Sequence, residues 1–462
     1  MERFENPAMA GVSEESICRF FSRLDSLDFD MHSVIMMRYG KVLLESYYEP
    51  YGCDSLHRMF SVTKSFVGLA IGCLAEEGRI NLDAPITSYF PEYSSDYEYT
   101  KRTTIRNMLM MRTPHERTTY KLDFSKNWVE SYFITEPTHE PGTVFSYDTS
   151  ASHVLCGLVE KITGMTFLDY LRTRFLDEIG FSKGAYCLKD NWGVSIGGSG
   201  LMATAMDLAK TANFVMNGGK HCGKQLMDGD FIKEATSFLS ATCVRGGFTD
   251  EKQGYGMQFW RTRNNGFMFY GIGGQLALCL PDKDFVMVTT ADTLGYQGGV
   301  QAILDIFWNE IYSVLDKKTT GNSEELAEIL SSRKINPVNG YGKDFEGRYV
   351  FSKNGMGLSE LYVISDKHGG SIEYTNLTGC HKLKFSTGGF CNDKFPYYNC
   401  EAITSGAWND NMLMIKSRLT GEFTGSVTME LYFTDYGVTI SSRKTEGTLF
   451  NEFNGIVQGR KS

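Results

Sequence analysis

A serine and a lysine three residues apart, Ser61 and Lys64, stand at the start of an apolar stretch that extends to Glu77. Three residues along an α-helix return nearly to the same face, so the Ser61 hydroxyl and the Lys64 amine could touch there. Burial and the positive end of the helix dipole both favour the neutral form of a lysine in the first turn. Because a neutral lysine can accept a serine proton, the pair could act as a nucleophile and its base.

The same Ser-x-x-Lys spacing occurs twice more, at Ser331 and Lys334 and at Ser441 and Lys444. Both of these copies lie among charged residues, and no long apolar helix follows either one. Spacing alone therefore selects none of the three, and the buried helix predicted after Ser61 favours the first copy.

Composition limits the classes of partner. The 462 residues allow two or three domains, and the net charge of −9 is spread without a basic stripe. This argues against nucleic acid and against anionic membrane surfaces, and favours a small-molecule partner.

The charged N-terminal residues predict no signal peptide. Eleven cysteines without a Cys-x-x-Cys pair indicate neither a zinc site nor a disulfide framework, so we expect a cytoplasmic protein without metal or cofactor. The sequence leaves homo-oligomerisation open.

Apolar periodicity predicts the elements that must position the pair. A helix capped by Ser13 is followed by a β-hairpin over residues 34–37 and 42–48. Four later strand-like segments, 255–261, 267–270, 275–280 and 285–290, predict an antiparallel meander covered by a helix over 300–315. The fold class is therefore α/β (α+β), with an antiparallel sheet flanked by helices.

Between the hairpin and the meander the chain is mainly helical and irregular. Tyr147 is predicted to lie in a loop, after breaks at Pro137 and Pro141 and ahead of a helix over 154–162. The glycine-rich stretch 197–201 matches no phosphate-binding spacing and predicts a tight turn before a helix over 204–216.

The predicted domains follow from these elements. Residues 1–322 form a catalytic domain with a helical lobe at about 83–250, and 323–340 form a linker with a short helix, preceded by a linker-like stretch at 317–322. Residues 341–462 are rich in strands, which predicts a C-terminal all-β barrel-like domain or sandwich. This domain could restrict the active site, mediate dimerisation or bind a ligand.

Over roughly its first two-thirds the chain resembles the serine β-lactamase and penicillin-binding-protein superfamily, most closely the class C-like branch of esterases, amide hydrolases and D-aminopeptidases. Ser61 to Lys64 matches the first motif, Tyr147 to Thr149 is similar to the Tyr-x-Asn second motif, and Gly271 to Gly274 occupies the position of the third. Better Tyr-x-Asn matches at 374–376 and 397–399 fall after the third motif, outside the family's order.

The resemblance implies a mechanism. Ser61 attacks an acyl carbonyl, and Lys64 and Tyr147 relay its proton before water releases the acyl-enzyme. The backbone N–H groups of Ser61 and Gln275 would hold the oxyanion, and a shift of one residue would give the second role to Gly274. The remaining residues expected to contact substrate are Thr149, Ile272, Gly273 and Gly274.

Two departures from the family pattern bear on the substrate. Ile272 stands where many relatives carry Lys or His, which removes a group that could engage a substrate carboxylate. Thr149 replaces Asn and removes an amide donor. The expected activity is hydrolysis of a small ester or amide rather than of β-lactams. The alternatives are an acyltransferase of the same fold and a catalytically silent ligand-binding protein.

Four other residues that could be drawn into the chemistry are expected to be structural. His57 and His153 lie beside apolar residues, where a lone histidine is more often packed than catalytic. Tyr255 and Trp260 fit the core of the sheet at least as well as the wall of a pocket.

Overall fold

The computed structural model describes residues 2–27, 29–317 and 323–462. The predicted catalytic-domain end at 322, and residues 318–322 of the linker-like stretch, lie outside the described residues. The chain forms two compact units. The first comprises Met1–Ala291 with Gly298–Arg333, and the second comprises Asp292–Gln297 with Lys334–Ser462.

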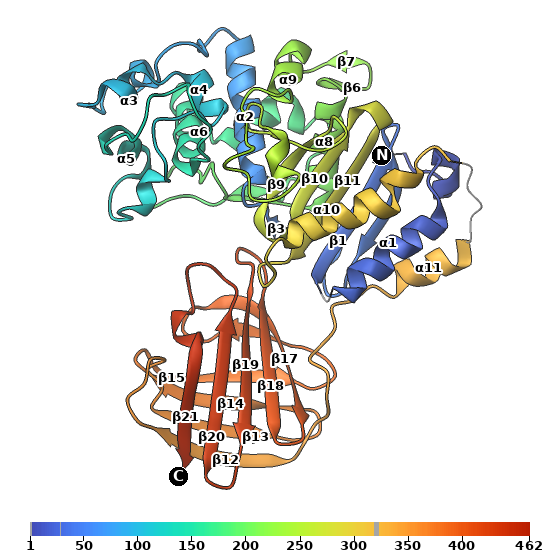
Figure 1. The fold of residues 1–462 in the computed structure, drawn as a ribbon, viewed down its shortest axis with the longest axis vertical. Coiled ribbons are helices and arrows are strands. Elements are labelled where there is room, and N and C mark those ends of the chain that lie inside the picture. Colours follow the sequence, from blue (N-terminus) through green and yellow to red (C-terminus); the bar gives the residue numbers. More distant parts are fainter. Residues whose placement is uncertain (1, 28, 318–322) are drawn as a thin grey trace. The chain divides into compact units, whose positions relative to one another are not determined.

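A six-stranded sheet forms the centre of the first unit, in the order β2-β1-β11-β10-β9-β8. It joins the N-terminal hairpin to the late meander and confirms the predicted antiparallel sheet (Figure 1). The strands are β1 (Asp30–Arg38), β2 (Lys41–Tyr47), β8 (Trp260–Arg261), β9 (Phe267–Gly271), β10 (Gln275–Leu280) and β11 (Phe285–Asp292). Three short strands, β3 (His57–Arg58), β5 (Leu201–Ala203) and β4 (Tyr186–Cys187), form a separate sheet, and β6 (Lys220–His221) pairs with β7 (Lys224–Gln225).

Helices cover the large sheet. Helices α1 (Glu14–Ser26) and α10 (Gly299–Glu310) pack side by side (Figure 1), and α11 (Ser323–Ser331) packs on α1. Helix α2 (Val62–Glu76) packs on β9, and α8 (Ala205–Met216) packs on β1 and β10. The sheet residues Ile35, Ala277 and Val288 share one hydrophobic core with α2 and α8, because alternate side chains of a strand point to the same face.

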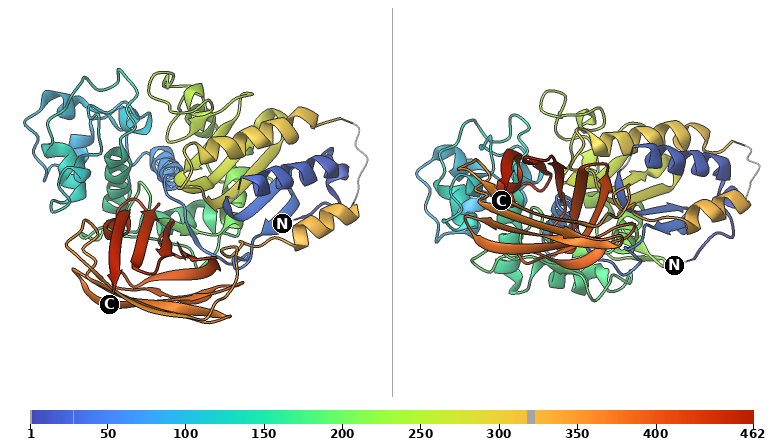
Figure 2. Two further views of the ribbon diagram at one scale, coloured as in Figure 1. Left: turned by 60° about the horizontal axis from the view of Figure 1, so that its bottom comes forward. Right: turned by 90° about the horizontal axis from the view of Figure 1, so that it is seen from below.

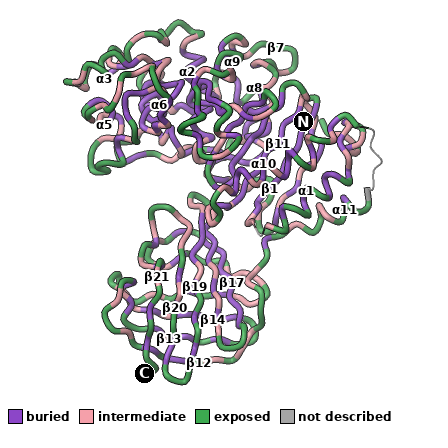
Figure 3. The backbone as a smooth tube through the Cα atoms, viewed as in Figure 1, coloured by how far each residue is buried: buried purple, intermediate pink, exposed green. Residues whose placement is uncertain are grey.

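The structure has the predicted Ser13 cap at the start of α1 and the predicted buried helix after Ser61. The Ser13 side chain caps α1 by accepting from the backbone N–H of Ser16. Helix α2 is buried on every side from Val62 to Leu74 (Figure 3), and Gly78 follows it with a left-handed φ of 68°.

Besides α2 and α8, the region between the hairpin and the meander contains one further long helix and several short ones. The long helix is α6 (Thr149–Thr163), which begins five residues earlier than predicted because Asp148 caps it by accepting from the N–H of Ser150. The short helices are α3 (Glu98–Arg102), α4 (Ile105–Leu109), α5 (Trp128–Ile134), α7 (Phe167–Leu171) and α9 (Gly229–Ala235).

Two predicted elements are shorter in the structure. The strand expected over 255–261 is reduced to Trp260 and Arg261, because Gly254 and Gln258 have φ values of 113° and 65° that interrupt an extended backbone. The helix expected to reach residue 315 ends at Glu310, and a 3₁₀ turn over Tyr312–Val314 follows.

The second unit is a closed β-barrel. Its ten strands pair in one sheet, and β15 also pairs with β17, which closes the sheet on itself (Figure 2). A barrel is one of the two predicted forms of the C-terminal domain. The strands are β12 (Phe345–Phe351), β13 (Glu360–Ser365), β14 (Gly369–Asn376), β15 (Gly379–Ser386), β16 (Cys391–Phe395), β17 (Cys400–Asn409), β18 (Met412–Leu419), β19 (Ser426–Phe433), β20 (Gly437–Lys444) and β21 (Gly455–Lys461). Their inward residues, among them Val363, Trp408 and Leu413, form a core separate from that of the first unit.

Across the part of the chain that the structure describes, we find no helix with the length and apolar character needed to span a membrane.

One buried glutamine ties together three of the helices. The Gln258 side chain accepts from Ser152 Oγ of α6 at 2.6 Å and donates to the carbonyls of Met108 and Leu109 in α4 at 3.2 and 3.0 Å. Its backbone carbonyl accepts from Ser65 Oγ of α2 at 2.6 Å. A single residue with a left-handed backbone therefore fixes α2, α4 and α6 relative to one another.

We expect Gln258→Ala to lower the free energy of unfolding by about 3 kcal/mol, because it leaves buried polar partners without hydrogen bonds. Urea denaturation followed by circular dichroism measures this change. Gln253→Ala is the matched control: that side chain is exposed and makes one hydrogen bond, to the Thr249 carbonyl, so its effect should stay within about 0.5 kcal/mol. Equal effects of the two substitutions would contradict the role given to Gln258.

Candidate active site

Ser61 lies at the N-cap position of α2, but its hydroxyl does not cap the helix. The preceding residue, Phe60, has a left-handed φ of 44°, an unusual conformation for a bulky residue. Strained backbone of this kind persists only where the surrounding structure enforces it, and it often marks a functional turn. The Ser61 hydroxyl is thus left to interact with side chains rather than with the helix backbone.

Strand β5 anchors the chain on both sides of the turn that carries Ser61. The Met59 N–H donates to the Leu201 carbonyl of β5 at 2.8 Å, and the Leu201 N–H donates to Thr63 Oγ1 at 3.1 Å. The chain before and after Ser61 is therefore anchored to the same strand, which limits the motion of the hydroxyl.

Lys64 is buried, and its amine lies against Ser61. Lys64 Nζ is 2.9 Å from Ser61 Oγ and 2.7 Å from the carbonyl oxygen of Gly198. Burial lowers the pKa of Lys64 to about 7, with a smaller lowering from Lys121 and an opposing effect of Asp148. Lys64 can therefore be uncharged at neutral pH and accept a proton.

Tyr147 is the third residue of the candidate site, beside Ser61 and Lys64. It immediately precedes the cap of α6, and the centre of its ring lies 5.0 Å from Lys64 Nζ. Burial raises the pKa of Tyr147 to about 12, and a hydrogen bond with Ser61 opposes this rise. Tyr147 is consequently protonated at neutral pH, so it can donate and accept hydrogen bonds but does not carry a charge.

Sequence reasoning missed three residues that set the environment of Lys64. Gly198 supplies the second partner of the amine, and the charges of Lys121 and Asp148 shift its pKa in opposite directions. An Asp immediately before a helix is a cap signal that could have drawn attention to Asp148. Gly198 and Lys121 are distant in sequence from Lys64, and no local pattern identifies them.

Asp148 is a buried carboxylate beside Tyr147. It accepts hydrogen bonds from Ser150 and, at 3.1 Å, from Thr113 Oγ1. Burial raises the pKa of Asp148 to about 6, against the lowering effect of these hydrogen bonds. Asp148 thus remains largely ionised at neutral pH and supplies negative charge close to the Ser61 group.

The stretch 197–201 forms the predicted tight turn, since the N–H groups of Ser199 and Gly200 donate to the Ile196 carbonyl. A Cβ on Gly198 would lie 2.2 Å from the Thr149 methyl group. Thr149 therefore packs against the turn that holds Lys64. Its contact with a substrate stays a prediction.

The third-motif segment lies next to the Ser61 turn. A Cβ added to Gly271 at the end of β9 would lie 2.5 Å from the Met59 carbonyl oxygen. Ile272 is 50% exposed at the turn that follows, while Gly273 and Gly274 are buried and have left-handed φ values.

Gln275, the first residue of β10, is buried and turned toward β11. Its side chain donates to the Ala291 carbonyl at 2.8 Å and accepts from the Ala291 N–H at 3.3 Å. That pairing fixes the backbone of Gln275 at the start of β10. The participation of its N–H in an oxyanion hole stays a prediction.

The histidines and aromatic residues that the sequence set aside are buried. His153 Nε2 pairs with Asp190 Oδ2 at 3.1 Å, and burial lowers the pKa of His57 to about 4. Tyr255 and Trp260 pack against each other, with ring centroids 5.1 Å apart.

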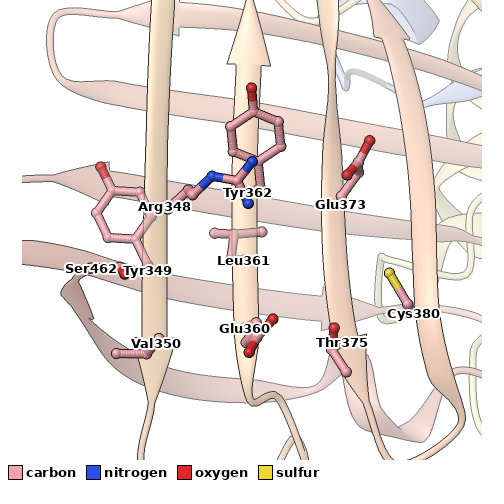
Figure 4. A pocket seen from close by; sticks show the side chains of 10 residues that line it. All are labelled: Arg348, Tyr349, Val350, Glu360, Leu361, Tyr362, Glu373, Thr375, Cys380 and Ser462. Atoms are coloured by element: carbon pink, nitrogen blue, oxygen red, sulfur yellow. The ribbon is translucent and has the colours of Figure 1, made fainter.

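The barrel carries a groove of its own, with a volume of about 320 Å³ (Figure 4). The Arg348 guanidinium lies 4.1 Å over the Tyr362 ring there, and Glu360 and Glu373 also line the groove. None of the sequence-predicted site residues contributes to this groove.

Helices around an antiparallel sheet, with a Ser–Lys pair at the start of a buried helix, define a class of serine hydrolases with a β-lactamase-like fold. The family model described as Beta-lactamase matches residues 28–303, more than half of the chain. The chain therefore belongs to the Beta-lactamase family, and it is a serine hydrolase of the β-lactamase and penicillin-binding-protein superfamily, in the esterase and amidase branch.

Two relatives show how far the similarity extends. The 6-aminohexanoate-dimer hydrolase of Paenarthrobacter ureafaciens is 27% identical over 276 residues, which cover 55% of this chain and 70% of that protein. Protein flp of Staphylococcus aureus is 26% identical over 160 residues, which cover 31% of this chain and 32% of flp. The chain thus spans about a third of flp.

Solved structures show the same fold. EstCE1, a hydrolase with promiscuous acyltransferase activity, has a TM-score of 0.52 and 15% identity, covering 64% of this chain and 99% of that chain. SurE has a TM-score of 0.52 and 13% identity, covering 97% of this chain and 99% of that chain. The likeness to SurE therefore extends into the C-terminal unit.

The surroundings of Lys64 predict a pH dependence with a defined sign. Because Lys64 accepts a proton only when neutral, the rate constant for fluorophosphonate labelling should rise with pH around a midpoint near 7. Lys121→Gln removes a positive charge that lowers the pKa of Lys64, so this midpoint should move to higher pH. Asp148→Asn removes a negative charge that raises the pKa of Lys64, so this variant should move the midpoint to lower pH. We expect each of the two shifts to be smaller than about one pH unit.

Labelling rates between pH 5 and 9, read by mass spectrometry of intact protein, measure these midpoints. Thermal unfolding of each variant checks that it is folded over the same range. Shifts of both variants in one direction, or identical midpoints in all three proteins, would contradict this account of Lys64.

Proposed function

We propose that this protein cleaves a small ester or amide through an acyl-enzyme on Ser61, with Lys64 as the general base. The observation that carries the proposal is the 2.9 Å contact between Ser61 Oγ and a buried Lys64 amine whose pKa lies near neutrality. A nucleophile and a base within hydrogen-bond reach, with the pKa of the base near the working pH, are what acyl transfer through serine requires.

The proposed reaction has two halves. Neutral Lys64 takes the Ser61 proton as Oγ forms a bond to the acyl carbon. The proton then passes to the leaving group with Tyr147 as the relay, as the bond to the leaving group breaks. In the second half Lys64 takes a proton from water as the water oxygen attacks the acyl carbon. The bond between that carbon and Ser61 Oγ then breaks, and Lys64 returns the proton to Oγ as the acid is released. The N–H groups of Ser61 and Gln275 are proposed to hold the oxyanion in both halves, with Gly274 as the alternative.

The substrate side of the site is proposed to include Thr149, Ile272, Gly273 and Gly274. The half-exposed Ile272 presents an apolar side chain in place of the Lys or His that many relatives carry, which supports a neutral ester or amide over a β-lactam. The name of the Paenarthrobacter relative, 6-aminohexanoate-dimer hydrolase, supports an amide as one substrate class, because an amine and a carboxyl group join through an amide. Eleven free cysteines support a reducing, cytoplasmic location. The proposed catalytic domain is 1–322, with its helical lobe at about 83–250.

Ser61→Ala should abolish covalent labelling by a fluorophosphonate, since the variant lacks the nucleophile. Mass spectrometry of intact protein measures the added mass, and peptide mapping locates it. The other Ser-x-x-Lys copies offer matched controls. Ser441 lies in β20, where a spacing of three places Ser441 and Lys444 on opposite faces, so Ser441→Ala should label like the wild type.

Equal labelling of the Ser61→Ala variant would refute the proposal. A wild-type protein that binds esters and amides saturably without labelling or turnover would favour the silent ligand-binding alternative.

Acyl transfer to an alcohol or amine is the second candidate function. The likeness to EstCE1 favours it, because that fold neighbour is a hydrolase with promiscuous acyltransferase activity. With an ester substrate and increasing concentrations of an added amine, hydrolysis yields only the free acid. A rising fraction of amide at constant ester consumption would instead show that the acyl-enzyme is captured by the acceptor, which identifies transferase activity.

A further inference from the structure

A cluster of aromatic side chains lies behind Tyr147. Trp260, in β8, is buried, and its ring centroid lies 5.3 Å from that of Tyr147 with an interplanar angle of 37°. Phe145, Tyr255 and Tyr270 enclose Trp260, with ring centroids 5.6, 5.1 and 5.9 Å from it. Packing on several sides leaves the indole little freedom to turn.

The indole N–H of Trp260 has no conventional partner. Among the described residues, Trp260 Nε1 is buried and makes no hydrogen bond of normal length. Buried tryptophan N–H groups usually find an acceptor, so an unused donor beside a catalytic candidate calls for an explanation. The Trp260 indole does interact with the Tyr147 hydroxyl, and this interaction lowers the pKa of Tyr147 against the effect of burial. Catalytic hydrogen bonds are often long in a free enzyme and tighten when substrate binds.

In its contact with the Tyr147 hydroxyl, the indole N–H of Trp260 must be the hydrogen-bond donor. An indole N–H only donates, so a Tyr147 oxygen that accepts from it must point its own proton elsewhere. The Tyr147 hydroxyl also interacts with the Ser61 hydroxyl, which is in contact with Lys64 Nζ. The chain of groups then runs from Trp260 through Tyr147 and Ser61 to Lys64, and the Tyr147 proton faces the reacting atoms.

The titratable groups around Tyr147 do not fix the orientation of its hydroxyl proton. Lys64 Nζ lies over the face of the Tyr147 ring, and the charge of Glu251 raises the pKa of Tyr147. Glu251 accepts from the Tyr270 hydroxyl at 2.6 Å, and Tyr255 is buried in its neutral form. Lys64 gains and loses a proton during the reaction and the tyrosines can both donate and accept, whereas the indole N–H of Trp260 donates in every step.

We propose that Trp260 is a positioning residue, whose indole N–H donates to the Tyr147 hydroxyl and aims the Tyr147 proton at the leaving group. This inference rests on the proposed acyl-enzyme mechanism. In acylation, the bond between the acyl carbon and the leaving atom breaks, that atom receives the Tyr147 proton, and Tyr147 is reprotonated from Lys64. The N–H of Trp260 stabilises the negative charge that develops on the Tyr147 oxygen during this transfer.

The role predicts a dependence on the leaving group that a structural tryptophan would not produce. An alkyl ester needs a proton on its departing alkoxide, whereas p-nitrophenolate leaves without one. For Trp260→Phe, which keeps an aromatic ring but lacks the N–H, we expect kcat/KM to fall about tenfold for an ethyl ester. For the p-nitrophenyl ester of the same acid the fall should be less than twofold. This loss is modest beside the 10²–10⁴-fold that general acid–base catalysis contributes, because Tyr147 itself remains.

Two further proteins make the test decisive. Replacing Trp260 by β-(3-benzothienyl)alanine keeps the shape of the bicyclic ring without the N–H, and it should reproduce the same difference between esters even if Trp260→Phe fails to fold. Trp128→Phe is the matched control, because Trp128 also has a buried N–H without a partner but stacks on Tyr120 with ring centroids 4.3 Å apart. It should leave the ratio between the two esters unchanged.

Equal losses for the two esters in the Trp260 variants, or no loss for either, would overturn this inference while the labelling of Ser61 still upholds the proposed function. A wild-type protein that turns over neither ester and shows no label on Ser61 would overturn both.

Discussion

The burial of the Lys64 amine is the constraint on which the rest of the first unit depends. An ammonium group removed from water costs several kcal/mol unless it is paired or gives up its proton. Here desolvation is the largest cause of the lowered pKa, and the hydroxyl of Ser61 and the carbonyl of Gly198 receive the polar amine. Helix α2 satisfies this constraint because it is apolar on every side and lies inside the core rather than on its surface.

A buried amine of this kind also requires close approach of its neighbours. Residue 198 must lack a Cβ for this packing, because the Thr149 methyl group occupies the space that a Cβ would need. A Cβ on Gly271 would likewise collide with the Met59 carbonyl. Gln258 then fixes α2 against α6 through Ser65 and Ser152. The polar bonds of Gln258 in an apolar core make this arrangement specific, since each buried partner would be left unsatisfied in any other packing.

Local sequence patterns predicted most of the fold. The predictions failed where contacts between residues distant in the sequence determine the backbone. The Ser13 cap, the hairpin and the meander depend on neighbouring residues, and the structure confirms them. The strand expected over 255–261 was wrong over most of its length, because Gln258 adopts a left-handed backbone to reach three helices that sequence spacing does not bring together. In the site, the Ser61–Lys64 contact follows from helical spacing alone. The roles of Gly198 and Lys121 could not be predicted, because they arise from segments more than fifty residues away.

The cause of the lowered Lys64 pKa indicates which substitutions could change substrate preference without removing the base. Because desolvation outweighs both Lys121 and Asp148, the basicity of Lys64 depends mainly on the packing of α2 rather than on these two charges. A substitution at the exposed Ile272, which is proposed to contact substrate, would therefore leave the base in place. Tyr147 differs, because its pKa reflects both burial and hydrogen-bonding groups around it. Under the proposed mechanism, changes in the aromatic cluster behind Tyr147 would consequently affect proton delivery, whereas changes around Ile272 would affect which substrates are accepted.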